Sequence, residues 1–158
     1  MERTINTVTK VELPAESDTL EFGRRIGAVL EPGDLVLLEG PLGAGKTVLA
    51  RGIAEGLGVS GRVSSPTFII AREHRPGPSG RGIPLVHVDA YRLGGDLDQL
   101  DDLDLDTALV DAAVVIEWGE GGERLSADHL LIRLARRADD ARIATVVPHG
   151  TWTARAIP

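Results

Sequence analysis

The sequence from Leu35 to Thr47 reads Leu-Val-Leu-Leu-Glu-Gly-Pro-Leu-Gly-Ala-Gly-Lys-Thr, and it decides the fold class. Its first four residues form an apolar run of the length of a buried strand. Gly40 to Thr47 then matches the phosphate-loop pattern G-x-x-x-x-G-K-[ST]. In the following stretch, Val48 to Leu57, the apolar residues Leu49, Ile53 and Leu57 recur every four residues, which is helical spacing. Strand, glycine-rich turn and helix is the order that a phosphate-binding loop requires.

Each part of this loop has a chemical task. Gly40, Gly43 and Gly45 let backbone N–H groups turn toward a phosphate, and the following helix presents its positive N-terminal end there. Lys46 would reach the β- and γ-phosphates, and the hydroxyl of Thr47 would bind Mg²⁺. A glycine turn before an ordinary helix is the alternative, but the complete motif with both flanks favours nucleotide binding.

The composition is that of an ordinary globular protein, and it excludes several classes. The 158 residues fit one domain, residues 1–158, and hydrophobic residues make up 42% of them. The chain has no cysteine, which excludes disulfides, thiol catalysis and thiolate zinc sites. We expect a cytoplasmic location and no membrane partner, because no apolar leader and no membrane-spanning stretch occur. The net charge of −7 argues against a general nucleic-acid-binding surface.

Periodicity and turn residues divide the rest of the chain into short elements. One helix has N-cap candidates at 17–19 and ends at 31–33, and a short helix is expected within the aspartate-rich stretch 96–111. Residues 75–82, rich in proline and glycine, are expected to form an exposed, mobile loop. The predicted strands cover residues 5–11, 35–38, 68–71, 85–88, 113–116, 128–134 and 143–147.

These elements predict an α/β fold of the P-loop NTPase type. We expect a three-layer sandwich around a mixed sheet, with parallel central strands and antiparallel edge strands. In such a sheet the carboxyl ends of the parallel strands line the ligand crevice. The sequence therefore places the phosphate loop and every residue that ends a parallel strand at the same edge.

Two apolar runs end in a carboxylate, which is the usual second element of a phosphate-loop site. Residues 85–88 end at Asp89, and residues 113–116 end at Glu117. Both acids are predicted to lie near Thr47, where one or both would help to hold a metal ion. The alternative is that either carboxylate caps a helix or faces solvent.

Three further features can be interpreted either as functional or as structural. Thr67, after a Ser-Pro turn that follows the loop helix, is a candidate switch residue that would sense the γ-phosphate, or else part of an ordinary turn. His87 lies inside an apolar run and is interpreted as a core or edge histidine rather than a ligand. The arginines at 133, 136, 137 and 142 are explained largely by a surface hairpin with charged edges.

The loop alone leaves three classes of protein open. A GTPase is disfavoured, because no Asn-Lys-x-Asp strand end is present. The first class is a partner-dependent ATPase. The second is a small-molecule kinase, which usually has an arginine-bearing lid; the sequence shows no helical lid insert, but four arginines keep this class open: Arg72, Arg75, Arg81 and Arg92. The third is a nucleotide-binding scaffold without catalysis.

Four motifs, in order and with fitting spacing over about residues 5 to 147, resemble the signature series of the TsaE family, also called YjeE. They are Gly40-x-Leu42-Gly43-Ala44-Gly45-Lys46-Thr47, Val63-x-Ser65-Pro66-Thr67-Phe68, His87-x-Asp89-x-Tyr91-Arg92-Leu93 and Ile116-Glu117-Trp118. Many families share the first motif, whereas the combination of the other three is specific. The resemblance implies a bacterial ATPase of tRNA threonylcarbamoyladenosine formation.

The resemblance also implies roles for individual residues. Lys46 and the loop from Gly40 through Val48, including Leu42 and Ala44, would bind the phosphates of ATP or ADP. Thr47 and Glu117 would hold Mg²⁺, while Asp89 would be the catalytic carboxylate and would also belong to the metal site. Contacts to the nucleotide are further implied for four residues: Thr67 as the switch residue, Trp118 beside the nucleotide, and Thr19 and Arg142 as weaker candidates for the adenosine.

A partner complex follows from the same resemblance. TsaE proteins associate with the TsaD–TsaB heterodimer, whose substrate is the adenosine following the anticodon in tRNAs that read ANN codons. An acidic chain is poorly suited to bind tRNA alone, so we expect contact with tRNA only through the complex. One departure is Pro41, where many members of the family have Asp. Proline has no backbone N–H and a fixed φ, and we expect phosphate binding to be retained.

Overall fold

The structure is a computed structural model, and it describes residues 8–41, 43–60, 71–78, 80–89, 105–117, 128–155 and 157. Its strands are β1 (Thr9–Leu13), β2 (Leu35–Glu39), β3 (Ala71–His74), β4 (Leu85–Asp89), β5 (Ala113–Glu117), β6 (His129–Arg136) and β7 (Arg142–His149). Its helices are α1 (Glu16–Val29), α2 (Lys46–Leu57), the short α4 (Leu105–Ala108) and the 3-10 helix η3 (Gly150–Ala154). Among the described residues, no helix is both long enough and apolar enough to cross a membrane.

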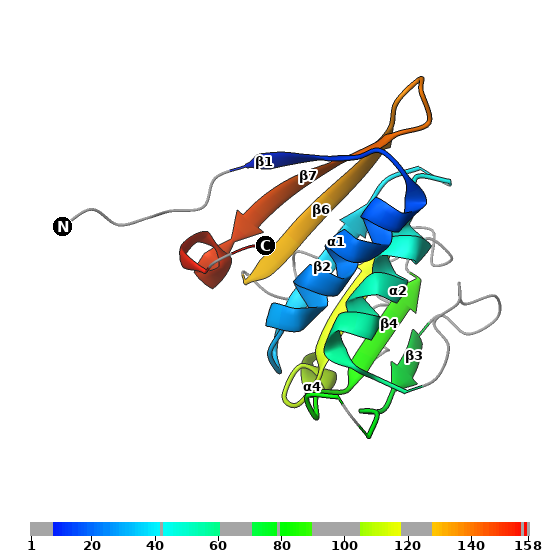
Figure 1. Cartoon of the computed structure of the whole chain (residues 1–158). Coiled ribbons are helices and arrows are strands. Elements are labelled where there is room, and N and C mark those ends of the chain that lie inside the picture. The colour runs from blue at the N-terminus through cyan, green and yellow to red at the C-terminus, as the bar shows by residue number, and fades with distance from the viewer. Residues whose placement is uncertain are drawn as a thin grey trace.

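All seven strands form one mixed sheet in the order β1-β7-β6-β2-β5-β4-β3 (Figure 1). The four central strands β6, β2, β5 and β4 run parallel to one another. The outer strands pair antiparallel: β3 with β4 at one edge, and β7 with both β6 and the other edge strand, β1. The predicted fold class is therefore confirmed. The carboxyl ends of β2, β4 and β5 lie at one edge of the sheet, where the chain continues into the phosphate loop and the two candidate carboxylates.

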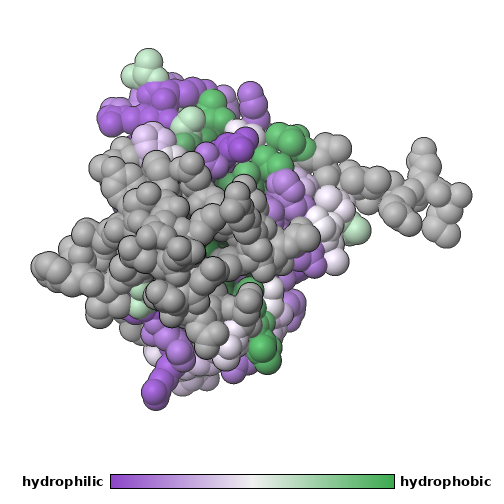
Figure 2. All heavy atoms as spheres, turned by 180° about the vertical axis from the view of Figure 1, so that it is seen from behind, coloured by the Kyte–Doolittle hydropathy of each residue, from purple (hydrophilic) through white to green (hydrophobic). Residues whose placement is uncertain are grey.

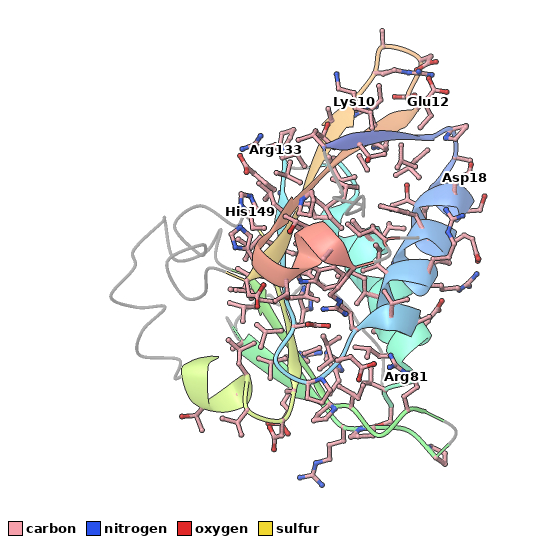
Figure 3. All side chains as sticks on the ribbon, turned by 90° about the vertical axis from the view of Figure 1, so that its left-hand side faces the viewer. Lys10, Glu12, Asp18, Arg81, Arg133 and His149 are labelled. Atoms are coloured by element: carbon pink, nitrogen blue, oxygen red, sulfur yellow. The ribbon has the colours of Figure 1, made fainter. Side chains whose placement is uncertain are left out.

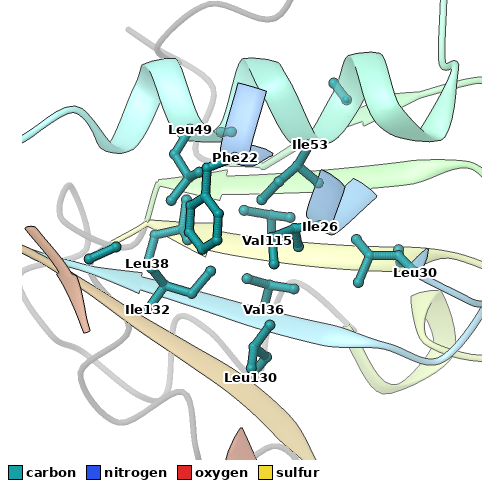
Figure 4. Packing of buried hydrophobic residues seen from close by; sticks show 14 of the residues in the cluster. Phe22, Ile26, Leu30, Val36, Leu38, Leu49, Ile53, Val115, Leu130 and Ile132 are labelled. Carbon is teal, nitrogen blue, oxygen red and sulfur yellow. The ribbon is translucent and has the colours of Figure 1, made fainter. Parts of the chain in front are cut away.

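Helices α1 and α2 cover one face of the sheet, and the larger core lies beneath them. Figure 4 shows Phe22 and Ile26 of α1 and Leu49 and Ile53 of α2 above the aliphatic side chains of the central strands. The facing side chains are Val36, Leu38, Val115, Leu130 and Ile132, all fully buried. The core is aliphatic with few aromatic residues, as expected from the composition.

The opposite face carries a second, smaller cluster. Alternate residues of the same strands, including Leu35, Leu37 and Val114, point to this side, and Ala108 at the end of α4 and the following Leu109 pack against it. Figure 2 shows the molecule from this side, where both hydrophilic and hydrophobic side chains reach the surface. Because both faces of the central strands are apolar, these strands read in the sequence as continuous apolar runs.

The helices α1 and α2 touch along their backbones through glycine. Gly23 and Gly27 on α1 meet Gly52 and Gly56 on α2, and a β-carbon added at Gly27 would lie 2.2 Å from the carbonyl oxygen of Ile53. A side chain at these positions would separate the two helices. The start of α1 is thereby held at a fixed distance from the start of α2, which carries the phosphate loop.

Two local predictions are corrected by the structure. The N-cap of α1 is Ala15 and not a residue of 17–19, because the carboxylate of Asp18 accepts the Ala15 backbone N–H at 2.8 Å and so sets the start of the helix earlier.

The stretch 75–82 is largely exposed as predicted, but hydrogen bonds attach it to the rest of the chain. Gly77 N–H donates to Gly58 O at 2.9 Å, and the Arg81 guanidinium donates to Leu30 O at 2.7 Å (Figure 3). Arg81 thus caps the carboxyl end of α1.

Other predicted elements lie partly outside the described residues. Strand β1 extends to Leu13 rather than to residue 11, and β3 extends to His74 rather than ending at 71. The predicted starts at 5 and 68 and the short helix near 97–103 lie outside the described residues. Helix η3 was not predicted: it buries Trp152 and places Arg155 on Asp34 through two hydrogen bonds of 2.7 and 3.0 Å. The hairpin of β6 and β7 matches its prediction closely.

Candidate nucleotide site

The phosphate loop joins the end of β2 to the start of α2, as the sequence predicts. Gly45 is the N-cap of α2 with φ of 102°, a left-handed value that glycine adopts without strain. Gly40 is needed for space, because a β-carbon there would lie 2.6 Å from the carbonyl oxygen of Leu134. The first-turn N–H groups of α2 therefore emerge at the edge of the sheet, where helix geometry leaves them without intrahelical acceptors.

The lysine of the motif is folded over its own loop. Lys46 is 7% exposed, and its ammonium donates to the carbonyl oxygens of Gly40 and Pro41. The Pro41 carbonyl also accepts the N–H of Ala44 at 3.1 Å, while the Pro41 side chain faces solvent. The residue that departs from the family pattern thus takes part in the loop through its carbonyl, which any residue would supply.

The loop threonine is linked directly to a candidate carboxylate. Thr47 Oγ1 donates to Glu117 Oε1 at 3.2 Å, although the two residues are 70 positions apart in the sequence. Glu117 ends β5, next to β2 in the sheet, and is only 4% exposed. Its other oxygen, Oε2, lies 2.5 Å from Nε2 of His87, which β4 contributes and which is fully buried.

Asp89 is the register partner of Glu117. The two residues end the parallel strands β4 and β5 side by side, and their backbones are paired. The structure therefore places the backbone of both predicted carboxylates at the edge of the sheet that carries the loop. The side chain of Asp89 lies outside the described part of the chain.

A pocket of about 410 Å³ opens beside the phosphate loop. Its walls come from three elements that are distant in sequence: the start of α1, the start of α2 and the hairpin between β6 and β7. Thr19, Val48 and Arg142, which were expected to contact the nucleotide, all line it, together with Gly45. Thr19 is 2% exposed, and its Oγ1 has no hydrogen-bond partner within the described residues. The volume is within the range of small-ligand pockets, about 300–1,000 Å³.

Three predicted site residues lie outside the described part of the chain: Leu42, Thr67 and Trp118. The remaining ones gather at one edge of the sheet, in two adjoining groups. One group surrounds Thr47 and Glu117, and the other lines the pocket beside Gly45. Within the described ranges, no three His, Cys, Asp or Glu side chains are arranged to hold a metal ion by themselves.

Comparison with known proteins identifies the family. The model of the family described as "Threonylcarbamoyl adenosine biosynthesis protein TsaE" matches residues 13–144, which include every described residue of the site. The chain belongs to the TsaE family. Its sequence resemblance to that family is therefore confirmed over most of its length.

Relatives within the TsaE family are close in sequence and in length. A protein of Streptomyces coelicolor named "tRNA threonylcarbamoyladenosine biosynthesis protein TsaE" is 56% identical over 142 residues, which cover 86% of this chain and 94% of the relative. A Bacillus subtilis protein of the same name is 38% identical over 135 residues, covering 84% and 81%. The crystal structure of Bacillus subtilis YdiB superimposes with a TM-score of 0.75 at 30% identity, covering 96% of this chain and 92% of the other.

Two features of this TsaE-family site were missed by reasoning from the sequence. His87 is buried, as predicted for a core histidine, but it also contacts the candidate metal carboxylate. The alternation along β4 contained this signal, because His87 and Asp89 are two residues apart and so share one face of the strand. The second is Arg142, which lines the pocket where a nucleotide contact is expected and also bonds to the phosphate loop itself, at Gly43 O and Ala44 O. No sequence signal links residues 43 and 142.

Proposed function

We propose that this chain is a magnesium-dependent ATPase that acts in tRNA threonylcarbamoyladenosine biosynthesis together with a TsaD–TsaB heterodimer. One observation carries the proposal: the loop threonine Thr47 and the strand-end carboxylate Glu117 are in direct contact at 3.2 Å. This pair joins the phosphate loop to the second acidic element that phosphoryl transfer requires. Membership of the TsaE family supports the biological process.

ATP binding is supported by the two adjoining groups of the site. The pocket lined by Thr19 and Val48 would receive the nucleoside, and the N–H groups at the start of α2 would face the phosphates. Lys46, whose ammonium rests on loop carbonyl oxygens, would transfer its hydrogen bonds to phosphate oxygens. Because loop and pocket meet at Gly45, one nucleotide would span both.

The residues at the loop fit a magnesium ion. Mg²⁺ prefers oxygen ligands and is commonly held by one or two protein groups together with substrate phosphates. The hydroxyl of Thr47 and the carboxylate of Glu117 are two such oxygen donors in contact with each other, so they would hold it jointly. When bound, the ion neutralises charge on the phosphate oxygens during transfer.

The hydrolytic step is assigned to Asp89. Its place at the end of β4, in register with Glu117, is one strand removed from the metal pair. A carboxylate there would accept a hydrogen bond from the attacking water and orient it. The proposal also keeps Thr67 as the residue that senses the γ-phosphate and Trp118 as a neighbour of the nucleotide, on the strength of the family resemblance.

The partner requirement rests on the family and on charge. The net charge of −7 makes unaided binding to tRNA unfavourable, so the chain would meet tRNA only through the complex. A site that needs an added partner to turn over quickly is common among phosphate-loop ATPases, since charge-stabilising groups are often supplied in trans.

The decisive experiment is a phosphate-release assay with and without purified TsaD–TsaB. We expect slow turnover by the chain alone and a rise of about tenfold or more on adding the heterodimer, with co-purification of the three proteins. Lys46→Ala should abolish turnover, whereas substitution of the only other lysine, Lys10→Ala on the exposed strand β1, should not (Figure 3). Rapid hydrolysis by the chain alone, unchanged by TsaD–TsaB, would contradict the proposal.

The same assay separates the remaining classes. A small-molecule kinase would move labelled phosphate to a metabolite and release little free phosphate. A scaffold without catalysis would keep its function in the assembly when Glu117 is changed to Gln and lose it when Lys46 is changed to Ala. An ATPase loses turnover in both variants.

A further inference from the structure

The Arg142 guanidinium, at the start of β7, is bonded to the phosphate loop. Its Nε donates to Ala44 O at 3.1 Å, and one terminal nitrogen donates to Gly43 O at 3.0 Å. The other terminal nitrogen donates to Asp140 O at 2.5 Å, within the same hairpin. Three of its donor groups are thus used on backbone carbonyl oxygens, two of which belong to the loop.

The direction of a carbonyl group fixes the direction of the next N–H group. In a planar trans peptide the C=O and the following N–H point to opposite sides. Holding Ala44 O on the Arg142 side therefore turns the N–H of Gly45 the other way, toward the helix start where a phosphate would lie. Holding Gly43 O likewise fixes the direction of the next N–H, that of Ala44, which closes the loop by donating to Pro41 O at 3.1 Å.

The hairpin that carries Arg142 is braced for this task. Its turn is closed by hydrogen bonds from Arg137 N to Ala141 O at 2.8 Å and from Asp140 N to Arg137 O at 3.1 Å. An ion pair of 2.5 Å joins Arg136, at the end of β6, to Asp140 in the turn. A second ion pair, of 2.7 Å, joins Arg137 to Glu12 on β1. Figure 3 shows Glu12 beside this end of the hairpin.

We propose that Arg142 is a positioning residue of the phosphate loop, which it acts on through the Gly43 and Ala44 carbonyls, and that it is not a specific contact for the adenosine. The inference rests on the proposed nucleotide binding and deepens it. Carbonyl oxygens repel phosphate oxygens, so the guanidinium keeps two of them on the side away from the anion. The hairpin and the loop thereby form one rigid unit.

Inorganic tripolyphosphate distinguishes this role from an adenosine contact, because it carries the phosphates without the nucleoside. We would measure the affinity of the full chain for Mg-ATP and for Mg-tripolyphosphate by calorimetry, in the native form and in Arg142→Gln. The expected result is that both affinities fall by the same factor, about tenfold, because a charged hydrogen-bond donor to each carbonyl is lost. Arg142→Lys should recover only part of the loss, since an ammonium cannot bond to both carbonyls in the planar fork geometry.

Arg137→Gln is the matched control. Arg137 lies in the same hairpin turn and loses two ion pairs on substitution, with Asp139 and Glu12, but it does not touch the loop. Both affinities should stay unchanged in this variant, because these ion pairs are exposed and contribute little, while the backbone hydrogen bonds that close the turn remain. A fall in ATP affinity alone in Arg142→Gln would show an adenosine contact and overturn the inference, as would unchanged affinity for both ligands. An equal loss in Arg137→Gln would show that the hairpin as a whole is responsible and would also overturn it.

A second measurement needs no nucleotide and separates this inference from the proposed function. Amide hydrogen exchange of the ligand-free chain should show faster exchange at Ala44 in Arg142→Gln by about tenfold, with exchange in the core strands unchanged. If the native chain bound neither ATP nor tripolyphosphate, the proposed function would be wrong, but the exchange rate at Ala44 would still test whether Arg142 positions the loop. Unchanged exchange at Ala44 would overturn the positioning role.

Discussion

Nε2 of His87 lies 2.5 Å from Oε2 of Glu117, while Oε1 of the same carboxylate accepts the Thr47 hydroxyl at 3.2 Å. A histidine of β4 therefore fixes the carboxylate of β5 that meets the phosphate loop. The three side chains come from β4, β5 and the start of α2, which meet only in the folded chain. Because His87 and Glu117 are almost completely buried, the carboxylate has few other orientations that satisfy its oxygens.

The first prediction concerns His87 as a residue that orients Glu117, the carboxylate proposed to bind Mg²⁺. His87→Leu removes the partner of Oε2 and should lower turnover about tenfold or more while raising the Mg²⁺ concentration needed for half-maximal activity. His87→Gln keeps a donor and should retain more activity than His87→Leu. The measurement is ATP hydrolysis in the presence of TsaD–TsaB over a range of Mg²⁺ concentrations.

His149→Gln serves as the control for this experiment. His149 ends β7, where its ring stacks on His129 with centroids 4.2 Å apart, and it belongs to neither group of the nucleotide site. Its substitution should leave the Mg²⁺ dependence unchanged. Full activity of His87→Leu at low Mg²⁺ would show that Glu117 is oriented without the histidine.

The second prediction concerns Thr19 in the wall of the pocket. Its Oγ1 is buried with no hydrogen-bond partner within the described residues, which is unfavourable unless a ligand supplies one. Thr19→Val keeps the shape and should weaken ATP binding several-fold without lowering the free energy of unfolding, because no hydrogen bond to another described residue is lost. Calorimetric titration with ATP and with tripolyphosphate, and urea unfolding, would check this.

Tripolyphosphate affinity should be unaffected by Thr19→Val, which is the opposite of the pattern expected for Arg142→Gln. Thr145→Val, on β7, is the control for the loss of a threonine hydroxyl. Undiminished ATP affinity in Thr19→Val would remove Thr19 from the nucleotide site and leave the pocket as a structural feature.

The third prediction concerns the contact between α1 and α2. In Gly27→Ala the new β-carbon would lie 2.2 Å from the Ile53 carbonyl oxygen, so the helices must separate. Overpacking of this kind should lower the free energy of unfolding by about 1–3 kcal/mol. Urea unfolding followed by circular dichroism would measure it, with Ala28→Ser at the next, exposed position as control. Equal stability of the two variants would mean that the helices can shift apart at little cost.

Much of this fold could be predicted because local pattern and tertiary structure agree. The apolar runs at 35–38, 85–88 and 113–116 are buried on both faces, so they identified the parallel strands directly. Because parallel strands end at a common edge of the sheet, the proximity of Glu117 and Thr47 could be predicted from the sequence alone. This part of the site could be inferred because its side chains belong to the strand ends and to the phosphate loop, both of which have recognisable sequence patterns.

The parts that were missed depend on contacts between distant segments. Arg142 bonds to backbone carbonyls of Gly43 and Ala44, and carbonyl groups have no residue signature in a sequence. The anchored stretch 75–82 has the same explanation: its glycines allow close approach to Gly58, which composition alone reads as a loose loop. The N-cap of α1 was misplaced because Asp18 acts from inside the helix, on the backbone of Ala15.

The last prediction concerns His74 and the pH dependence of stability. His74 on β3 is buried, with Nε2 lacking a hydrogen-bond partner in the described part of the chain. Burial lowers the pKa of His74 below its usual value of 6.5, and the nearby His87 and Arg72 lower this pKa further. Between that lowered pKa and 6.5 the unfolded chain binds a proton that the folded chain does not. The contribution of His74 is therefore fully retained above pH 6.5 and is lost as the pH falls from 6.5 toward the folded-state pKa.

His74→Phe removes this titration, so the variant should lose less stability than the native chain as the pH falls. Urea unfolding midpoints measured at about pH 7.5 and about pH 5.5, on either side of the usual histidine pKa, would give the two differences to compare. His149→Phe is the control, because the stacked pair with His129 lies on β6 and β7 and its substitution should leave the His74 effect intact. An equal fall in the midpoint for the native chain and His74→Phe would show that other groups cause the acid sensitivity.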